Sequence, residues 1–179
     1  ALCLLGVTTA CGGGRLTQQE MHRAYQQALA FTETTARSDW QAHPDALTTA
    51  VGRLKQYFGE MTRANVEQTT KLLYAQDAFL CDTLHVALGA DQIQAYFLKT
   101  ADRVSALSVT FIDVSTVGPE VFARWTMTMQ VDGLAGGRPV VSYGVSHFRF
   151  DREGKVILHQ DFWDAGGSRH AVFQSPGNL

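Results

Sequence analysis

Apolar residues recur at intervals of three and four along the first part of the chain, which is the spacing of an amphipathic helix. Thr17 and Glu20 form a capping box just before the first such stretch, so we expect a helix over residues 17–38. Pro44 suits the first turn of a helix, and the apolar stripe that follows it reaches Met61. The pattern therefore predicts two long helices at the start of the domain.

Two shorter helices and a short strand are predicted next. Asn65 is a favoured N-cap residue, and the helix that it would begin ends at Leu73. A short apolar strand over 78–82 then precedes a fourth helix, which we expect Asp91 to cap. Tyr96 lies on the apolar stripe of that fourth helix.

From residue 105 onward the apolar residues alternate with polar ones, and Val, Phe, Thr, Ile and Trp are frequent. Four strands are predicted, over 106–117, 120–131, 139–150 and 155–163. Turn residues at 132–137 and 151–154 join successive strands as hairpins, so the sheet should be mainly antiparallel. Helices that precede strands in this way predict an α+β fold, with the helices packed on one face of a bent sheet.

The composition agrees with a single folded domain. The chain has 179 residues, a formal net charge of −2 and 45% hydrophobic residues. The length suits one domain, and the apolar fraction excludes a largely disordered protein. The charge balance, without any basic run, excludes nucleic-acid binding through phosphate neutralisation. We expect one domain over residues 15–179, with the helix at 17–38 as an N-terminal addition.

The first residues have the composition of a targeting segment. Residues 1–10 are apolar and uncharged, and they are too few to span a bilayer as a helix. They match the apolar region of a secretory signal without its basic start, so residues 1–14 are interpreted as a partial signal and flexible linker. Ala10 before Cys11 resembles a bacterial lipobox, with Thr8 where Leu is usual, and this makes Cys11 a candidate lipidation site. An ordinary signal end or a disordered tail is the alternative.

This segment also sets the expected location and the use of the cysteines. A signal predicts a protein of the cell envelope, secreted or anchored by lipid and facing the periplasm, whereas without a signal the location would be the cytoplasm. With Cys3 inside the signal and Cys11 lipidated, Cys81 has no partner, and a disulfide scaffold is excluded. We expect Cys81 to be a small buried apolar residue.

Four stretches of sequence carry a resemblance to a known family. They are Leu73–Asp82, Gly89–Phe97, Gly144–Phe150 and Gly154–Asp164. In this order they resemble the nuclear-transport-factor-2-like (NTF2-like) proteins, which include SnoaL-like and ketosteroid-isomerase-like domains, over roughly residues 47–164. The resemblance implies a cone in which helices and the concave face of a strongly bent sheet enclose an apolar pocket. Because this fold hosts many unrelated functions, it implies a pocket and not a reaction.

The resemblance also assigns individual residues to the pocket. Asp82 lies where a ketosteroid isomerase has its catalytic Asp, in the strand after the leading helices. Ser146 stands at the position of the second, hydrogen-bond-donating Asp. Phe58 stands near the position of the oxyanion-hole Tyr, with Tyr57 one residue away. Both departures remove donors that would stabilise an enolate, so a steroid isomerase is not expected.

Strand parity extends this assignment, because alternate residues of a strand face the same side. If Ser146 and Trp163 point inward, as the resemblance implies, then Asp161 and His159 also point inward. The residues expected to surround a ligand are Trp163, Trp125, Met127, Met129, Phe148, Ser146 and Tyr96. For the stripe from Trp125 to Met129, plain core packing is the alternative.

His159 and Asp161 would be neighbours on this inward face, where such a pair can act as acid and base. SnoaL-like cyclases and epoxide hydrolases of this fold resemble this arrangement. The alternative is a structural pair that braces the strand end against the helix at 17–38. A metal site that adds Asp82 is weaker, because no second His is placed inward, and we expect no metal or other cofactor.

Two functions remain open. The first is cofactor-free acid–base catalysis, such as isomerisation, cyclisation, hydration or epoxide opening, on a small lipophilic or cyclic molecule. Asp161 would be the base, His159 its partner and Asp82 a second acid–base group. The second is a non-catalytic ligand-binding or protein-interaction module of the cell envelope. Carboxylates with shifted pKa values that border the pocket would favour the enzyme.

The opposite faces of the same strands predict an assembly. Arg124, Tyr143, His147 and Arg149 are expected on the convex face of the sheet, which commonly forms the dimer interface in this fold. Aromatic residues and Arg are enriched at interfaces, so we predict a homodimer through this face.

Overall fold

The computed structural model describes residues 16–131 and 138–163, and it contains helices followed by strands. The helices are α1 (Gln18–Thr32), α2 (Pro44–Gly59), α3 (Arg63–Leu73) and α4 (Ala90–Ala101). The strands are β1 (Tyr74–Cys81), β2 (Val86–Leu88), β3 (Ala106–Val117), β4 (Glu120–Gln130), β5 (Val140–Phe150) and β6 (Val156–Trp163). The predicted α+β class is confirmed, and the segment 1–15 that holds Cys11 lies outside the described residues.

The six strands form one curled sheet in the order β2-β1-β6-β5-β4-β3. The pairs are antiparallel except for β1 and β6, which run parallel, so the sheet is mainly antiparallel as predicted. Two strand predictions need correction, because β1 begins at Tyr74, directly after α3, and because β2 was not expected. None of the helices in the described part of the chain is long and apolar enough to cross a lipid bilayer.

Two predicted helix caps are wrong. Thr62, and not Asn65, caps α3, since its hydroxyl accepts the Asn65 backbone N–H at 3.2 Å. The Asn65 side chain instead donates to backbone carbonyls at the end of α2, which fixes the α2–α3 connection. Gly89 precedes α4 with a φ of 83°, and Asp91 lies in the first turn, where it pairs with Lys71 at 2.6 Å. Gly89 has no side chain to cap α4, and its positive φ makes the turn from β2.

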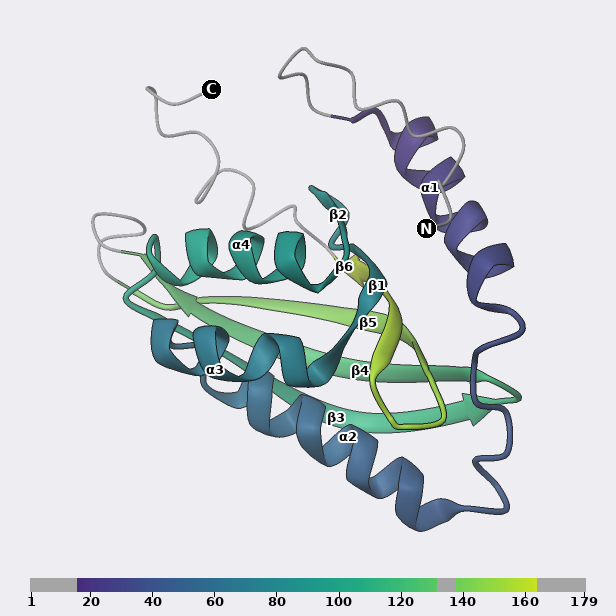
Figure 1. Cartoon of the computed structure of the whole chain (residues 1–179). Helices are drawn as coiled ribbons and strands as arrows, with labels where there is room; N and C mark the ends of the chain where they lie inside the picture. The colour runs from purple at the N-terminus through teal and green to yellow at the C-terminus, as the bar shows by residue number, and fades with distance from the viewer. Residues whose placement is uncertain (1–15, 132–137, 164–179) are drawn as a thin grey trace.

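Three helices, α2, α3 and α4, cover the concave face of the sheet (Figure 1). Leu54 of α2, Val66 of α3 and Ile93 of α4 are fully buried against the inward side chains of the strands. This packing forms the main hydrophobic core and places the three helices as one wall of the space in front of the sheet.

The first helix, α1, lies on the opposite face, beside the pair of β1 and β6 (Figure 1). Its buried stripe and the strand residues under it form a second apolar cluster of Met21, Ala24, Ala28, Phe79, Cys81 and Leu158. Alternation along β1 explains the two clusters, since Leu80 faces the main core and Cys81 faces α1. The position of α1 departs from the expected placement of the helices on one face, whereas α2, α3 and α4 follow it. Cys81 is buried, as predicted.

A charged cluster, formed by Glu120, His147 and Arg149, lies under α1 on this outer face. Both Glu120 carboxylate oxygens accept from Arg149, at 2.8 and 2.5 Å, and Oε2 also pairs with His147 Nε2 at 2.5 Å. Arg149 donates further to the Leu29 carbonyl at 2.6 Å, and the Tyr25 hydroxyl bonds to His147 Nδ1 at 2.7 Å. Burial lowers the pKa of His147, so the neutral ring donates from Nε2 and accepts from Tyr25.

These contacts change the surface that is open to a second copy of the chain. His147 and Arg149 face outward as strand parity requires, but α1 covers them, and they are 3% and 7% exposed. Arg124 is exposed and paired with Asp113, and Tyr143 is 65% exposed. A homodimer through the convex face remains a prediction, and Arg149 would not take part in it.

The charged cluster predicts a difference between two carboxylates on the same sheet face. Glu120→Ala should lower the free energy of unfolding by about 3 kcal/mol, because it leaves the Arg149 guanidinium buried without its partner. Asp113→Ala removes an exposed pair with Arg124, which solvent screens, and should lower the free energy of unfolding far less. Urea unfolding of the three proteins measures both values. Equal losses would show that α1 does not bury the cluster in solution.

Candidate functional site

A cavity of about 520 Å³ lies between the concave face of the sheet and the helices. Apolar side chains from α2, α4, β3 and β4, and from the connections that follow α2, α4 and β4, make up most of its wall: Phe58, Met61, Phe97, Val104, Leu107, Val109, Phe111, Trp125, Met127, Met129 and Val131. The remaining lining residues are Asp82, Leu84, Tyr96, Thr100, Arg103, Ser146, Phe148, His159, Asp161 and Trp163. Every residue that the sequence analysis proposed for catalysis or ligand contact borders this cavity. A volume of this size is typical of small-molecule sites.

The register of the strands brings the polar lining residues together. Ser146 of β5 is directly opposite Asp161 of β6, and Phe148 is opposite His159. On the other side of β5, Gly144 lies opposite Trp125 of β4. Ser146, Phe148, Asp161, His159 and Trp125 all lie on the inward face, as predicted, so one end of the cavity holds a polar group within an aromatic wall.

Asp161 is held by two side chains through one of its carboxylate oxygens. Ser146 Oγ donates to Asp161 Oδ1 at 2.5 Å, and Trp125 Nε1 donates to the same Ser146 oxygen at 2.8 Å. His159 Nε2 lies 2.8 Å from Oδ1 as well. No donor in residues 16–131 or 138–163 bonds to Oδ2. The carboxylate is therefore fixed in orientation, with one oxygen left to meet a molecule in the cavity.

His159 is fixed by a residue that the sequence analysis did not identify. The Tyr74 hydroxyl lies 2.8 Å from His159 Nδ1, and its ring stacks on the imidazole. Burial raises the pKa of Tyr74 well above its usual value, so the hydroxyl stays protonated and donates to Nδ1. The histidine proton then lies on Nε2 and points at Asp161. Tyr74 was missed because the predicted strand began at residue 78, so Tyr74 was not assigned to it.

Asp82 lies on the turn that follows β1, and its carboxylate is also fully oriented. Its Oδ1 accepts the backbone N–H groups of Leu84 at 2.9 Å and His85 at 2.7 Å, and its Oδ2 accepts from the Tyr96 hydroxyl. Burial raises the pKa of Asp82, and the negative charge of Asp161 adds to this rise. The pKa of Tyr96 is likewise raised by burial and by Asp82. The two groups form an acidic pair at the edge of the cavity.

The neighbouring side chains hold this pair in position. The exposed His85 ring stacks on Tyr96 with a centroid distance of 4.7 Å. Trp163 Nε1 donates to the Asp82 backbone carbonyl at 2.7 Å, which links the end of β6 to the turn. The Asp82 turn includes Thr83, which has a φ of 70° that non-glycine residues rarely adopt.

One alternative for the site needs correction, and two observations add to the description of the site. Phe58 lines the cavity, but the Tyr57 hydroxyl bonds to Thr70 inside the core and does not reach the cavity. His159 and Asp161 do not brace β6 against α1, because α1 packs on the other face of that strand. Arg103, just after α4, borders the cavity and was not identified, since no periodic pattern marks a residue in a connection.

Metal binding finds no support among the described residues. No group of three or more His, Cys, Asp and Glu side chains in residues 16–131 and 138–163 is arranged to hold a metal ion. The three candidates are instead engaged by tyrosine, serine and backbone donors, as described above.

Comparison with known families agrees with the geometry. The model of the SnoaL-like domain matches residues 54–159, more than half of the chain, and the chain belongs to this family within the NTF2-like superfamily. The match ends at His159, so Asp161 and Trp163 lie just beyond it. A search of curated protein sequences gives no match.

Solved structures share the fold at low sequence identity. TsrD from Streptomyces laurentii has a TM-score of 0.57 at 18% identity, covering 72% of this chain and 96% of its own. An LEH-like epoxide hydrolase of M. tuberculosis has a TM-score of 0.55 at 16% identity, and the match covers 66% of this chain and 84% of the hydrolase. A third structure is a protein of Catenulispora acidiphila with a ketosteroid isomerase-like fold, in complex with trimethylamine. It has a TM-score of 0.57 at 17% identity, and the match covers 68% of this chain and 90% of that protein. At these identities the likeness supports the fold alone.

The wall beside Asp161 predicts a strict requirement for glycine at position 144. A Cβ at Gly144 would lie within 2.6 Å of the Trp125 ring and 2.8 Å of Trp163 Cβ, so Gly144→Ala must displace the indole that donates to Ser146. We expect a loss of about 1–3 kcal/mol in unfolding free energy and a changed near-ultraviolet dichroism of the tryptophans. Gly52→Ala, in open space on α2, is the control and should be neutral or stabilising. A tolerated Gly144→Ala with unchanged dichroism would contradict this packing.

The raised pKa of Asp82 predicts a pH dependence of stability. Between its unfolded pKa of about 4 and its raised folded pKa, the folded state holds the proton longer, so stability falls as pH rises through this window. The side chain of Asp82→Asn cannot ionise. The free energy of unfolding of this variant should therefore rise relative to that of the wild type as the pH increases above about 4. Tyr96→Phe removes a hydrogen bond that lowers the pKa of Asp82. In this variant the fall in stability should therefore continue to higher pH than in the wild type. Urea unfolding from pH 3 to 8 measures both, and parallel profiles for wild type and Asp82→Asn would refute the assignment.

Proposed function

We propose that this protein is a cofactor-free acid–base enzyme that acts on a small lipophilic or cyclic molecule bound in the cavity. The observation that carries the proposal is the Asp161 carboxylate, whose Oδ1 is held by Ser146 and His159 while the residue borders the cavity. The reaction class is proton abstraction with isomerisation or cyclisation, or activation of water for hydration or epoxide opening. The epoxide hydrolase among the structural neighbours makes the last of these a natural first test.

Asp161 is the base in this proposal. With Oδ1 fixed by two donors, Oδ2 takes a proton from a substrate carbon or from a water molecule. The His159 imidazole keeps its Nε2 proton directed at Asp161 because Tyr74 donates to Nδ1. His159 is therefore a positioning residue, which holds the Asp161 carboxylate in one orientation.

Tyr96 and Asp82 supply the acid. When Asp82 is protonated, its Oδ1 still accepts two backbone N–H groups, so the proton lies on Oδ2 and faces Tyr96. The Tyr96 hydroxyl can then accept from Asp82 and donate to a carbonyl, enolate or epoxide oxygen in the cavity. In epoxide opening, Asp161 takes a proton from water, the new C–O bond forms as the epoxide C–O bond breaks, and the freed oxygen gains its proton from Tyr96. Asp82 replaces that proton.

The apolar wall of the cavity surrounds the two carboxyl groups and limits which molecules can bind. Trp125, Met127, Met129 and Phe148 surround the two carboxyl groups with apolar surface and make cavity shape a selecting feature. Methionine side chains adapt to irregular ligands, which suits a lipophilic substrate without many polar groups.

A non-catalytic binding module is the second candidate, and one observation favours it. Both Asp82 carboxylate oxygens and one of Asp161 are already engaged by protein donors, which is the arrangement expected of structural polar groups. In this case the cavity would bind the same class of lipophilic molecule without turnover.

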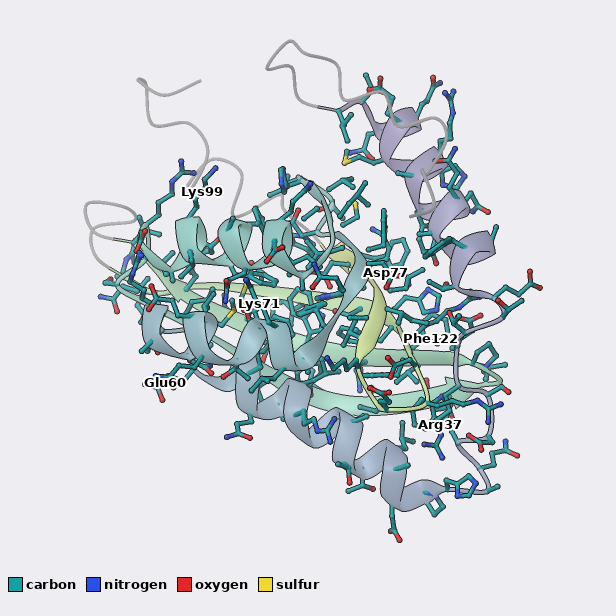
Figure 2. All side chains as sticks on the ribbon, viewed as in Figure 1. Arg37, Glu60, Lys71, Asp77, Lys99 and Phe122 are labelled. Carbon is teal, nitrogen blue, oxygen red and sulfur yellow. The ribbon has the colours of Figure 1, made fainter. Side chains whose placement is uncertain are left out.

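Asp161→Asn separates the two candidates, because it keeps the volume and removes the base. We expect proton exchange at the α-carbon of 2-tetralone in D₂O, or hydrolysis of styrene oxide, to fall by about 10²–10⁴-fold from the wild-type rate. Asp77→Asn, an exposed carboxyl on β1 (Figure 2), is the matched control and should retain the wild-type rate. NMR and chromatography measure the two reactions.

The same variants also test the non-catalytic binding module. If wild type and Asp161→Asn are both inactive over a panel of enolisable ketones and epoxides, but bind a fluorescent apolar probe alike, the binding module is favoured. Trp163→Ala should then abolish probe binding, because Trp163 lines the cavity and links β6 to the Asp82 turn.

A further inference from the structure

We infer that the cavity selects a lipophilic anion, whose acidic group binds Arg103 at the end of the cavity remote from the two carboxyl groups. This inference deepens the proposed function and rests on it only in requiring that the cavity binds a ligand. It names the class of molecule: an apolar body with one carboxylate, sulfonate or phosphate at its far end.

Charge is distributed unevenly around the cavity. Among the described lining residues, Arg103 is the only Lys or Arg, while Asp82 and Asp161 are the only acidic groups. An anionic group near the two carboxylates would be repelled, and an anionic group at Arg103 would be attracted. The cavity thus favours one orientation of an amphipathic anion.

The two charged ends are well separated along the fold. Arg103 follows α4 and lies just before β3, whose Leu107 pairs with Met129 at one end of the cavity. Trp125, which belongs to the Asp161 cluster, lies four residues from Met129 along β4. At ~3.4 Å per residue this is roughly 14 Å, and the side chains between the two ends are apolar. The anionic group of the ligand would thus lie on the order of 10 Å from the reacting atom.

Arg103 is also free to receive such a group. The adjacent Asp102 carboxylate accepts two bonds from Arg63, at 2.7 and 2.8 Å, on the outside of the fold. In residues 16–131 and 138–163, no carboxylate lies within ion-pair distance of the Arg103 guanidinium. The exposed position of Arg103 on the cavity wall keeps it hydrated until a ligand arrives.

A structural role at the end of α4 is the competing explanation, since a cation there complements the helix dipole. Lys99 tests this alternative because it lies in the last turn of the same helix, is exposed and does not line the cavity. Figure 2 shows Lys99 on the side of α4 that faces away from the sheet. Both residues share the helix-end environment, and only Arg103 can contact a molecule in the cavity.

The inference can be tested by measuring the binding of two fluorescent probes that share the same aromatic skeleton. 8-Anilinonaphthalene-1-sulfonate carries one sulfonate, and N-phenyl-1-naphthylamine lacks it. We expect Arg103→Gln to weaken binding of the sulfonate about tenfold, the order expected for one charge-assisted contact, and to leave binding of the neutral probe within about twofold. Lys99→Gln should change neither. Added salt should weaken the sulfonate in wild type and have little effect in Arg103→Gln.

The outcomes separate this inference from the proposed function. Val109→Trp, or Met127→Trp if the first variant unfolds in circular dichroism, fills the cavity and should remove binding of both probes. If Arg103→Gln leaves the ratio of the two affinities unchanged while the neutral probe still binds in the cavity, the anion assignment is overturned and the acid–base proposal stands. If neither probe binds the wild-type protein, or if filling the cavity does not change probe binding, the anion assignment is overturned, and the activity of Asp161→Asn decides the acid–base proposal separately. A tenfold loss specific to the sulfonate supports the assignment.

Discussion

A carboxylate placed against an apolar wall must find hydrogen-bond donors, and this requirement at Asp161 organises the candidate site. Ser146, on the neighbouring strand, and His159, two residues away on the same strand, meet the requirement through one oxygen. Each donor is held in turn, by Trp125 and by Tyr74, so the network extends from β4 through β5 and β6 to the start of β1. Four strands are thereby tied together by the polar group that the cavity exposes.

The two faces of the sheet solve the same physical problem in different ways. On the concave side, polar groups remain beside an unfilled space, where their protonation can matter to a ligand. On the convex side, Glu120, His147 and Arg149 are paired with one another, and α1 buries His147 and Arg149. The concave cluster is thus the one suited to chemistry, and the convex cluster fastens a helix.

Asp82 and Asp161 have identical side chains, but the two carboxylates have different surroundings and different hydrogen-bond partners. Asp82 lies on a turn, accepts three hydrogen bonds and has its pKa raised by burial. Asp161 lies on a strand and retains one oxygen without a donor among the described residues. Pairs of titratable groups placed in unlike environments commonly take acid and base roles, and this contrast underlies the assignment of the two carboxyl groups.

The sequence by itself determined the α+β class, the four long strands and which residues of each strand share a face, because hydrophobic alternation and strand parity are local properties. The resemblance to NTF2-like proteins added which of these faces borders the pocket and the position of Asp82 in it. Only the tertiary structure decided which face α1 covers, since an apolar stripe on a helix does not specify the surface that it meets. The same holds for Tyr74 and Arg103, which reach the cavity from the junction of α3 with β1 and from the connection after α4. The pairing of segments distant in the chain placed them there, and no local pattern records such pairing.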